Sequence, residues 1–242
     1  MRRLFVLTVF VIGCSMGVQS TTGLFRAGDG ALIELHVGPD QQIRGYMRAG
    51  DRIAALSSIS RDRSSVTATA TYDDGSRAEI RKAVRLIAVE MPASADVRRE
   101  IEEAYRRLAR AVEMKDFNAF QALRVAEFAT IPPDGVPSPR ARMAERARGL
   151  LERIQLPITT TNEILELTTR GDEAIATVRQ KFTRQQLGEN QPGSVPTTVR
   201  QRTIHTEVTQ RETWRKTTEG WKLVLVDEVR DHVRFLDGQR VP

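Results

Sequence analysis

The sequence predicts an α+β protein in which a small all-β unit precedes a larger unit of helices followed by strands. Residues 24–90 alternate with period 2, and turns rich in Gly and Asp recur about every ten residues. After Pro92 the apolar residues recur every three to four positions, which is typical of helices. From Ile158 onward the period-2 alternation returns, and a hairpin that carries both tryptophans closes the chain.

The composition is that of an ordinary globular protein with a basic balance. Of 242 residues, 40% are hydrophobic and 28% are charged, and the net charge is +6. A basic balance can indicate nucleic-acid binding. Here the arginines alternate with acidic residues, without long runs of like charge or interleaved stacking aromatics. We therefore predict no nucleic-acid partner.

The first residues have the pattern of a targeting segment. A basic start, Met1-Arg2-Arg3, precedes an apolar run of residues 4–13 that is too short to span a bilayer as a helix. The run ends in Val11-Ile12-Gly13-Cys14-Ser15, which resembles the lipobox of bacterial lipoproteins. The resemblance implies lipidation of Cys14, the sole cysteine, and an exported protein that is periplasmic or anchored at the outer membrane. The alternative is a plain secretory signal with an incidental Cys14.

We expect three segments along the chain: a signal peptide and linker at 1–20, a small β-meander domain at 21–93, and an α+β domain at 94–242. The meander is too short for a large core of its own, so we expect it to curl on itself or to lean on the next domain. Its expected strands are Leu24–Arg26, Ala31–Val37, Gln42–Arg48, Arg52–Leu56, Ser65–Tyr72 and Arg77–Val89.

Three helices are expected between the meander and the second group of strands. The first covers about 20 residues after Pro92-Ala93-Ser94, with one apolar stripe that includes Tyr105. The second begins at Asp116, a favourable N-cap residue. The third begins at Ser138-Pro139, a cap followed by proline at the first helical position, and Leu156-Pro157 ends it.

Four long antiparallel strands are expected to follow the helices. The first two form a hairpin across the turn at 169–172, and a loop rich in Gly, Pro and Asn leads to the last two. The last pair turns at Thr217-Thr218-Glu219-Gly220. The expected strands are Thr159–Leu167, Glu173–Gln186, Thr198–Lys216 and Trp221–Val229.

This order of elements resembles the NTF2-like (SnoaL-like) superfamily over about residues 94–235. The residues that carry the resemblance are Lys115-Asp116-Phe117, Ala126-Glu127-Phe128, Thr213-Trp214-Arg215 and Gly220-Trp221-Lys222-Leu223-Val224. The resemblance implies a cone, in which three helices pack on a curved antiparallel sheet around a cavity. The superfamily includes isomerases, hydrolases, polyketide cyclases, transport factors and proteins without known activity, so the fold does not select a function.

Asp227 is one candidate for chemistry in that cavity. By period 2 it lies on an apolar face of the last strand, together with Trp221, Leu223, Leu225 and Val229. Burial there would raise the pKa of the carboxyl group and suit it to acid–base work. The alternative is a carboxylate at the strand end that pairs with an arginine such as Arg230.

Three further residues are candidates for the pocket. His205 shares a strand face with Glu207, and the pair could transfer protons, but two ligands on one strand fall short of a zinc site. The sequence does not tell which face of that strand is concave. Tyr105 could direct its hydroxyl group into the cavity or pack in the core. Trp214, like Trp221, is expected in the core or the cavity wall.

The sequence leaves three classes of function open. No phosphate-binding loop, dinucleotide fingerprint, nucleophile elbow or zinc motif is present, so no cofactor or metal is expected. The favoured class is a non-catalytic binding or assembly module of the cell envelope. The alternatives are an isomerase- or hydrolase-type enzyme and a carrier of a small apolar ligand in the cavity. A homodimer through the sheet is compatible with the fold, and membrane contact is expected through the lipid anchor only.

Overall fold

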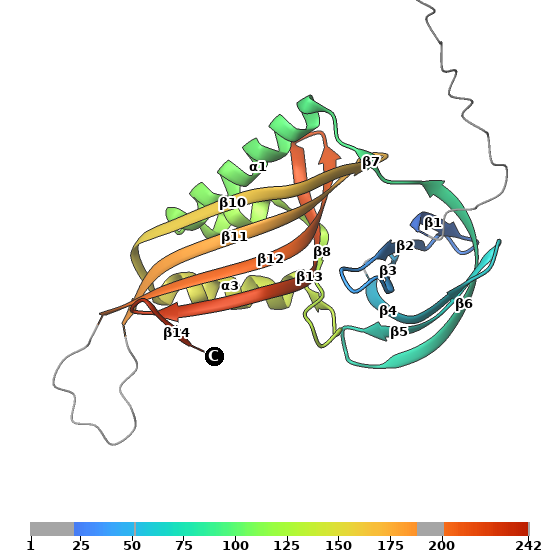
Figure 1. Cartoon of the computed structure of the whole chain (residues 1–242), viewed down its shortest axis with the longest axis horizontal. Coiled ribbons are helices and arrows are strands. Elements are labelled where there is room, and N and C mark those ends of the chain that lie inside the picture. Colours follow the sequence, from blue (N-terminus) through green and yellow to red (C-terminus); the bar gives the residue numbers. More distant parts are fainter. Residues whose placement is uncertain (1–21, 51, 188–200, 242) are drawn as a thin grey trace, which may run out of the picture.

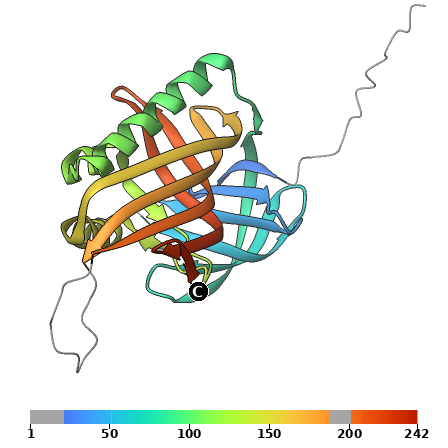
Figure 2. The same cartoon turned by 60° about the vertical axis from the view of Figure 1, so that its left-hand side comes forward.

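The computed structural model describes residues 22–50, 52–187 and 201–241. Two units lie side by side: an N-terminal barrel, and a curved sheet with helices along one face (Figure 1). A view turned by 60° shows the same arrangement, with α1 on the side of the sheet away from the barrel (Figure 2). The expected lipidation site, Cys14, lies outside the described residues.

Six strands form a closed antiparallel barrel, which confirms the expected meander. The strands are β1 (Gly23–Ala27), β2 (Leu32–Val37), β3 (Ile43–Ala49), β4 (Arg52–Arg61), β5 (Ser65–Tyr72) and β6 (Arg77–Ala88). The meander closes because β6 is long enough to pair with β5 through residues 77–83 and with β1 through residues 84–88. A Cβ atom at Gly45 would lie 2.2 Å from the carbonyl oxygen of Glu34, so only glycine permits this approach of β3 to β2.

The first helix of the second unit, α1 (Ala95–Glu113), begins where the sequence predicts. The Ser94 side chain accepts a hydrogen bond from the Val97 backbone N–H at 3.3 Å, which caps the helix. Asp96 in the first turn and Arg110 in the last turn complement the helix dipole. The side chains that α1 buries against the sheet are those of Ile101, Ala104, Tyr105, Leu108 and Ala111.

The remaining helices differ in part from expectation. Asp116 caps α2 (Phe117–Ala122), as predicted. The third helix, α3 (Arg140–Arg153), begins one residue later than predicted, because Ser138–Pro139 forms the short strand β9. Residues 124–130, where the sequence predicts no strand, form β8 (Arg124–Thr130) and pair in parallel with β13 (Gly220–Leu236).

The sheet is built on four long antiparallel strands, as predicted. The first and the last of them, β10 and β13, are much longer than expected, because pairing extends almost to the turns. The strands are β7 (Met91–Pro92), β10 (Ile154–Arg170), β11 (Glu173–Leu187), β12 (Gln201–Thr217), β13 (Gly220–Leu236) and β14 (Gln239–Val241), in addition to β8 and β9.

Within residues 22–50, 52–187 and 201–241, the buried apolar side chains form three groups. The largest lies between the helices and the inner face of the sheet and contains both tryptophans, Trp214 and Trp221. The second fills the barrel. The third is small and joins Tyr46 and Ile53 of the barrel to Ala129 and Leu225 of the sheet. The barrel thus covers part of the outer face of the sheet. No helix among the described residues has the length and apolar character needed to cross a membrane.

Candidate functional site

One buried carboxylate, Glu212 on β12, lies inside the cone and is 1% exposed. Its Oε2 accepts hydrogen bonds from the Tyr105 hydroxyl group at 2.7 Å and from Trp214 Nε1 at 3.1 Å. Its Oε1 accepts from Gln210 Nε2 at 2.5 Å. Burial raises the pKa of Glu212, and these hydrogen bonds act in the opposite direction.

Tyr105 and Trp214 enclose this carboxylate from two sides. Their rings meet edge to face with centroids 5.1 Å apart, and their side chains are almost completely buried. Glu212 lines none of the clefts described below. The group therefore ties α1 to β12, and its oxygens are already occupied by three donors.

A much larger group of charges lies between the barrel and the outer face of the sheet. Its centre is Glu34 on β2, which is 0% exposed. Glu34 Oε1 lies 2.7 Å from Arg211 Nη1, and Oε2 accepts hydrogen bonds from Arg170 and from the Tyr46 hydroxyl group. Burial alone would raise the pKa of Glu34, but the charges of Arg170 and Arg211 hold it well below its usual range.

Glu173 on β11 is the second centre of this group. It accepts hydrogen bonds from Arg48 of the barrel at 2.7 Å and from Arg170 at 2.8 Å. Arg215 lies 3.3 Å from the same carboxylate and also pairs with Glu127 on β8 at 2.5 Å. Burial opposes ionisation of Glu173, but the charges of Arg48 and Arg170 lower its pKa. The barrel and the sheet are therefore joined by Arg170 and Arg211, which each contact Glu34 and a second carboxylate, and by the pair of Arg48 with Glu173.

His36 on β2 lies at one edge of this interface and is 6% exposed. Its Nε2 is 2.9 Å from Glu228 Oε1 and 3.8 Å from Asp227 Oδ2, and its Nδ1 is 3.6 Å from Glu34 Oε1. Asp227 also lies 3.6 Å from Arg211. Burial raises the pKa of Asp227, and the nearby charges of Arg211 and His36 oppose that shift. Within the described residues, Asp227 Oδ1 has no hydrogen-bond partner.

Asp227 faces the barrel because β13 contains a bulge. Leu223 and Leu225 pair with consecutive residues of β12, so Val224 between them is an extra residue. Such a bulge reverses the side to which the following residues point. Leu223 packs in the cone core, whereas Leu225 and Asp227 face the barrel. The prediction that Asp227 shares a face with Trp221 and Leu223 is wrong for this reason.

Open clefts lie on several sides of the buried charges. One, of about 640 Å³, is lined by His36, Arg211 and Glu228, and its outer walls include Glu166 and Arg230. A second, of about 610 Å³, is lined by His36, Asp227 and Glu228 and by the loop at 131–135. A third, of about 450 Å³, reaches Arg48, Glu173 and Arg215. Three clefts thus lie where the barrel meets the sheet.

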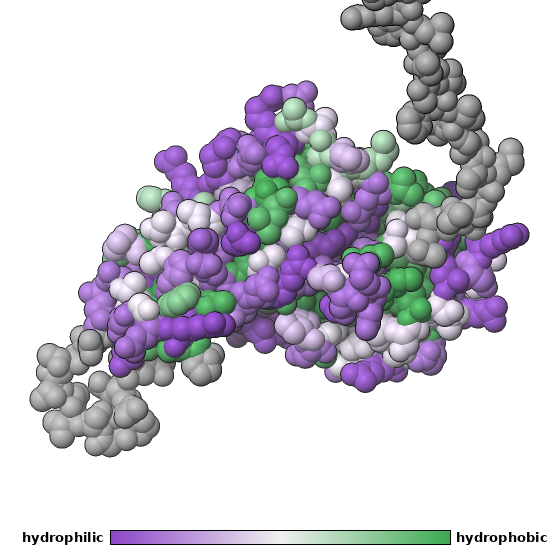
Figure 3. Space-filling view, in the orientation of Figure 1, coloured by the Kyte–Doolittle hydropathy of each residue, from purple (hydrophilic) through white to green (hydrophobic). Residues whose placement is uncertain are grey.

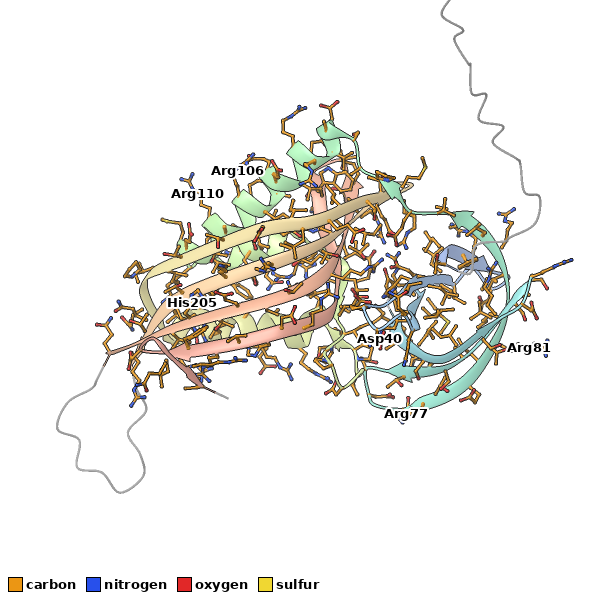
Figure 4. The ribbon with its side chains drawn as sticks, viewed as in Figure 1. Asp40, Arg77, Arg81, Arg106, Arg110 and His205 are labelled. Carbon is orange, nitrogen blue, oxygen red and sulfur yellow. The ribbon has the colours of Figure 1, made fainter. Side chains whose placement is uncertain are left out.

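The other predicted pocket residues lie in separate places. Tyr105 reaches Glu212 inside the cone and also lines a cleft of about 440 Å³ between α1 and β10. Trp214 is 0% exposed in the core. His205 lies on the outer face toward the far end of the sheet (Figure 4), with Nε2 2.9 Å from Glu207 Oε1 and Nδ1 2.8 Å from the Thr183 hydroxyl group. The structure does not bring these residues together with Asp227.

The residues that sequence reasoning missed are Glu212 and the charges of the domain interface. Glu212 could have been found from Trp214, because residues two apart on a strand share a face and Trp214 is a natural core residue. The interface charges had no comparable signal. Glu34, His36 and Arg48 alternate like ordinary exposed residues of a half-buried strand. Among the described residues, no group of His, Cys, Asp and Glu has the arrangement of a metal site.

Comparisons with known proteins give weak likenesses of structure. No family model matches the chain, and no curated protein matches it. Among solved structures, it is similar to a putative dehydratase from the NTF2-like family of Streptomyces avermitilis (TM-score 0.43, 15% identity, 55% of this chain and 96% of that chain). It is also similar to an NTF2-like protein of Cytophaga hutchinsonii (TM-score 0.40, 13% identity, 54% and 94%).

A hexachlorocyclohexane dehydrochlorinase is a third similar structure (TM-score 0.45, 10% identity, 61% of this chain and 94% of that chain). The solved structures that resemble this chain thus include NTF2-like proteins.

Proposed function

We propose that this protein is a non-catalytic binding or assembly module whose binding site lies in the clefts between the barrel and the sheet. The observation that carries the proposal is the buried cluster around Glu34 and Glu173, which joins two domains and has clefts on its borders. Ion pairs that hold both domains make a rigid support for a site between them.

The enclosed state of Glu212 favours binding over catalysis in the cone. A catalytic acid or base must come within hydrogen-bond distance of a substrate atom. Glu212 already accepts three hydrogen bonds from Tyr105, Trp214 and Gln210, and it lines none of the clefts described above.

The cleft of about 640 Å³ fits a polar ligand that carries both positive and negative charge. Its wall contains the acids Glu90, Glu166 and Glu228, together with Arg211 and Arg230. Its volume lies within the range of about 300–1,000 Å³ that is usual for ligand sites. A short peptide segment has the backbone dipoles and mixed charges that such a wall would recognise.

A panel of short peptides of mixed charge, screened by thermal shift and then by calorimetry, tests the proposal. The variant Glu166→Gln/Arg230→Gln changes the outer wall without touching the buried cluster, and we expect it to weaken binding about tenfold or more. The matched control Glu163→Gln/Arg179→Gln alters an exposed ion pair on the same sheet. The proposal fails if no peptide binds, or if both double variants bind as the wild type does.

An enzyme that uses Asp227 is the second candidate. Asp227 has a raised pKa, lines the cleft of about 610 Å³ and lies beside His36, which is the kind of site where acid–base chemistry occurs. Assays with model substrates of ester hydrolysis and ketone isomerisation test it. Activity that Asp227→Asn removes while the circular dichroism spectrum is retained would support this candidate. Activity that is absent, or unchanged in the variant, would exclude it.

The cellular localisation is proposed from the N-terminal segment that ends at Cys14. We propose export and lipidation at this cysteine, with the envelope as the place of action. Cells that express the protein should incorporate labelled palmitate into it, and globomycin should cause the unprocessed precursor to accumulate. Labelling that persists in Cys14→Ser, or a mature protein without lipid, would contradict the proposal.

A homodimer through the sheet also remains a proposal. The barrel occupies part of the outer face, so the part that bears His205 is the one available for such contact (Figure 4). Hydrophilic residues predominate over the face of the molecule seen in Figure 3, which favours a weak rather than a permanent dimer. Sedimentation velocity over a range of concentrations distinguishes a dimer from a monomer.

A further inference from the structure

A groove of about 430 Å³ lies between α1, α2 and the beginning of β13, away from the domain boundary. Its apolar residues are Ala111, Met114, Ala119, Ala122, Leu123 and Trp221. Neither Glu212 nor Trp214 lines it, so it is not the space inside the cone. Met114 is 69% exposed, which is unusual for a large apolar side chain, and thioether side chains adapt readily to a bound apolar group.

The charges at the rim of this groove are unbalanced. Its two acids have partners: Asp116 accepts the capping hydrogen bond from the Ala119 N–H at 2.9 Å, and Glu219 accepts from Lys222 at 2.5 Å. Arg107 and Arg110 have neither an ion pair nor a side-chain hydrogen bond among the described residues. Both are exposed on the last two turns of α1, and Arg110 projects from that helix in Figure 4.

An apolar floor beside two unpaired guanidinium groups matches one kind of ligand. A guanidinium group binds a carboxylate through two parallel hydrogen bonds. An apolar chain in the groove would cover the exposed side chain of Met114. We propose that this groove binds a single long-chain carboxylate, with its head group at Arg107 and Arg110 and its chain along Leu123 and Trp221. This site is independent of the clefts at the domain boundary.

The chain contains a natural reporter for this binding. It has only two tryptophans. Trp221 is 6% exposed and lines the groove at the edge of the core, whereas Trp214 is 0% exposed and does not line the groove. Titration with monomeric dodecanoate should therefore change the tryptophan fluorescence in a saturable way, and the change should be lost in Trp221→Phe. Calorimetry on the same protein measures binding without relying on fluorescence.

Two pairs of measurements separate head-group recognition from apolar adsorption. Arg107→Gln/Arg110→Gln should weaken dodecanoate binding about tenfold or more, since it removes both cationic partners. The control Arg99→Gln, which alters an exposed pair with Asp96 on the same helix, should leave binding unchanged. Dodecyltrimethylammonium has the same chain with a cationic head and should bind at least about tenfold more weakly than dodecanoate.

Three results would overturn the proposal. The first is no saturable binding of dodecanoate by either method. The second is equal binding of the carboxylate and the ammonium compound, or binding that survives Arg107→Gln/Arg110→Gln. The third is binding to phosphatidylglycerol vesicles but not to monomeric dodecanoate, since that would indicate a membrane surface. None of these results bears on peptide binding at the domain boundary, so the two proposals fail separately.

Discussion

Glu212 inside the cone and Glu34 at the domain interface are both fully buried carboxylates on β-strands, and their surroundings are opposite in kind. Glu212 accepts hydrogen bonds from the neutral groups of Tyr105, Trp214 and Gln210. Glu34 lies against two arginines and a tyrosine. Accordingly, burial raises the pKa of Glu212, whereas the arginines hold the pKa of Glu34 well below its usual range.

The comparison indicates two uses of a buried acid. A carboxyl group among neutral donors can become protonated, so its burial has a modest electrostatic cost. Its hydrogen bonds orient the nearby side chains. A carboxylate between arginines must stay charged, and each arginine that is removed leaves an uncompensated charge in the interior. The cone therefore tolerates change at its acid better than the domain interface does.

The largest effect is expected from Arg170→Ala. This change leaves Glu34 and Glu173 without a shared partner at a fully buried position. Breaking such a buried pair costs about 3–5 kcal/mol of unfolding free energy, which urea denaturation measures. The control Arg179→Ala alters an exposed pair with Glu163 and should cost at most about 1 kcal/mol. Equal losses in the two variants would contradict the role given to the interface.

Tyr46 and Tyr105 provide a matched pair of substitutions, with smaller expected losses of unfolding free energy than Arg170→Ala. Tyr46→Phe removes a hydrogen bond to the charged Glu34 and should cost about 2 kcal/mol. Tyr105→Phe removes a hydrogen bond to Glu212, whose raised pKa favours the neutral form, and should cost about 1 kcal/mol. Thermal unfolding of both variants shows which of them loses more unfolding free energy. The reverse order would mean that Glu212, rather than Glu34, carries the more tightly held charge.

The pH dependence of stability should have one sign for Glu34 and Glu173 and the opposite sign for Glu212. The lowered pKa values of Glu34 and Glu173 stabilise the fold above the unfolded pKa of 4.5, and this contribution is lost as the pH falls toward their folded values. The raised pKa of Glu212 has the opposite effect on stability, because the folded state releases this proton at a higher pH than the unfolded chain does. Its contribution therefore falls as the pH rises above 4.5.

Glu212→Gln isolates this second contribution. The difference in unfolding free energy between the variant and the wild type should shift in favour of the variant as the pH rises from 4.5. Urea denaturation at several pH values measures it. A difference that stays constant with pH would mean that the pKa of Glu212 is unchanged by folding.

The smallest effect is expected at His205. Its ring is about one-third exposed on the outer face and contacts Glu207 and Thr183. His205→Ala should change the unfolding free energy by no more than about 0.5 kcal/mol, which thermal unfolding would reveal. A loss of several kcal/mol would place this histidine in a buried contact that the structure does not contain.

Much of the fold was predictable because local patterns are strong where one face of an element is buried. The Gly and Asp turns marked the barrel strands, the apolar stripe marked α1, and the two tryptophans marked the last hairpin. Residues 124–130 were missed as a strand because a short apolar run between two helices has no distinctive period. Their strand character comes from pairing with β13, which lies about 100 residues away in the sequence.

The candidate site was far less predictable than the fold. The sequence predicts Asp227 on an apolar face inside the cone, but the bulge at Val224 directs it to the barrel, where His36 and Arg211 are its neighbours. A single extra residue in a strand leaves no mark in a sequence of alternating apolar residues, although it reverses the side to which the following residues point, up to the next bulge.

The sequence by itself determined the order of the main helices and strands, the turns about every ten residues in the barrel, and the apolar face of each long element. These features depend on neighbours within a few residues. Only the tertiary structure decided which strand faces are concave, that β6 closes the barrel onto β1, and that Glu34 meets Arg170 and Arg211. The contacts of Glu34 with these two arginines join residues more than 100 positions apart. Their energies depend on the burial and the close approach of these charges, which arise only once the barrel has packed against the sheet.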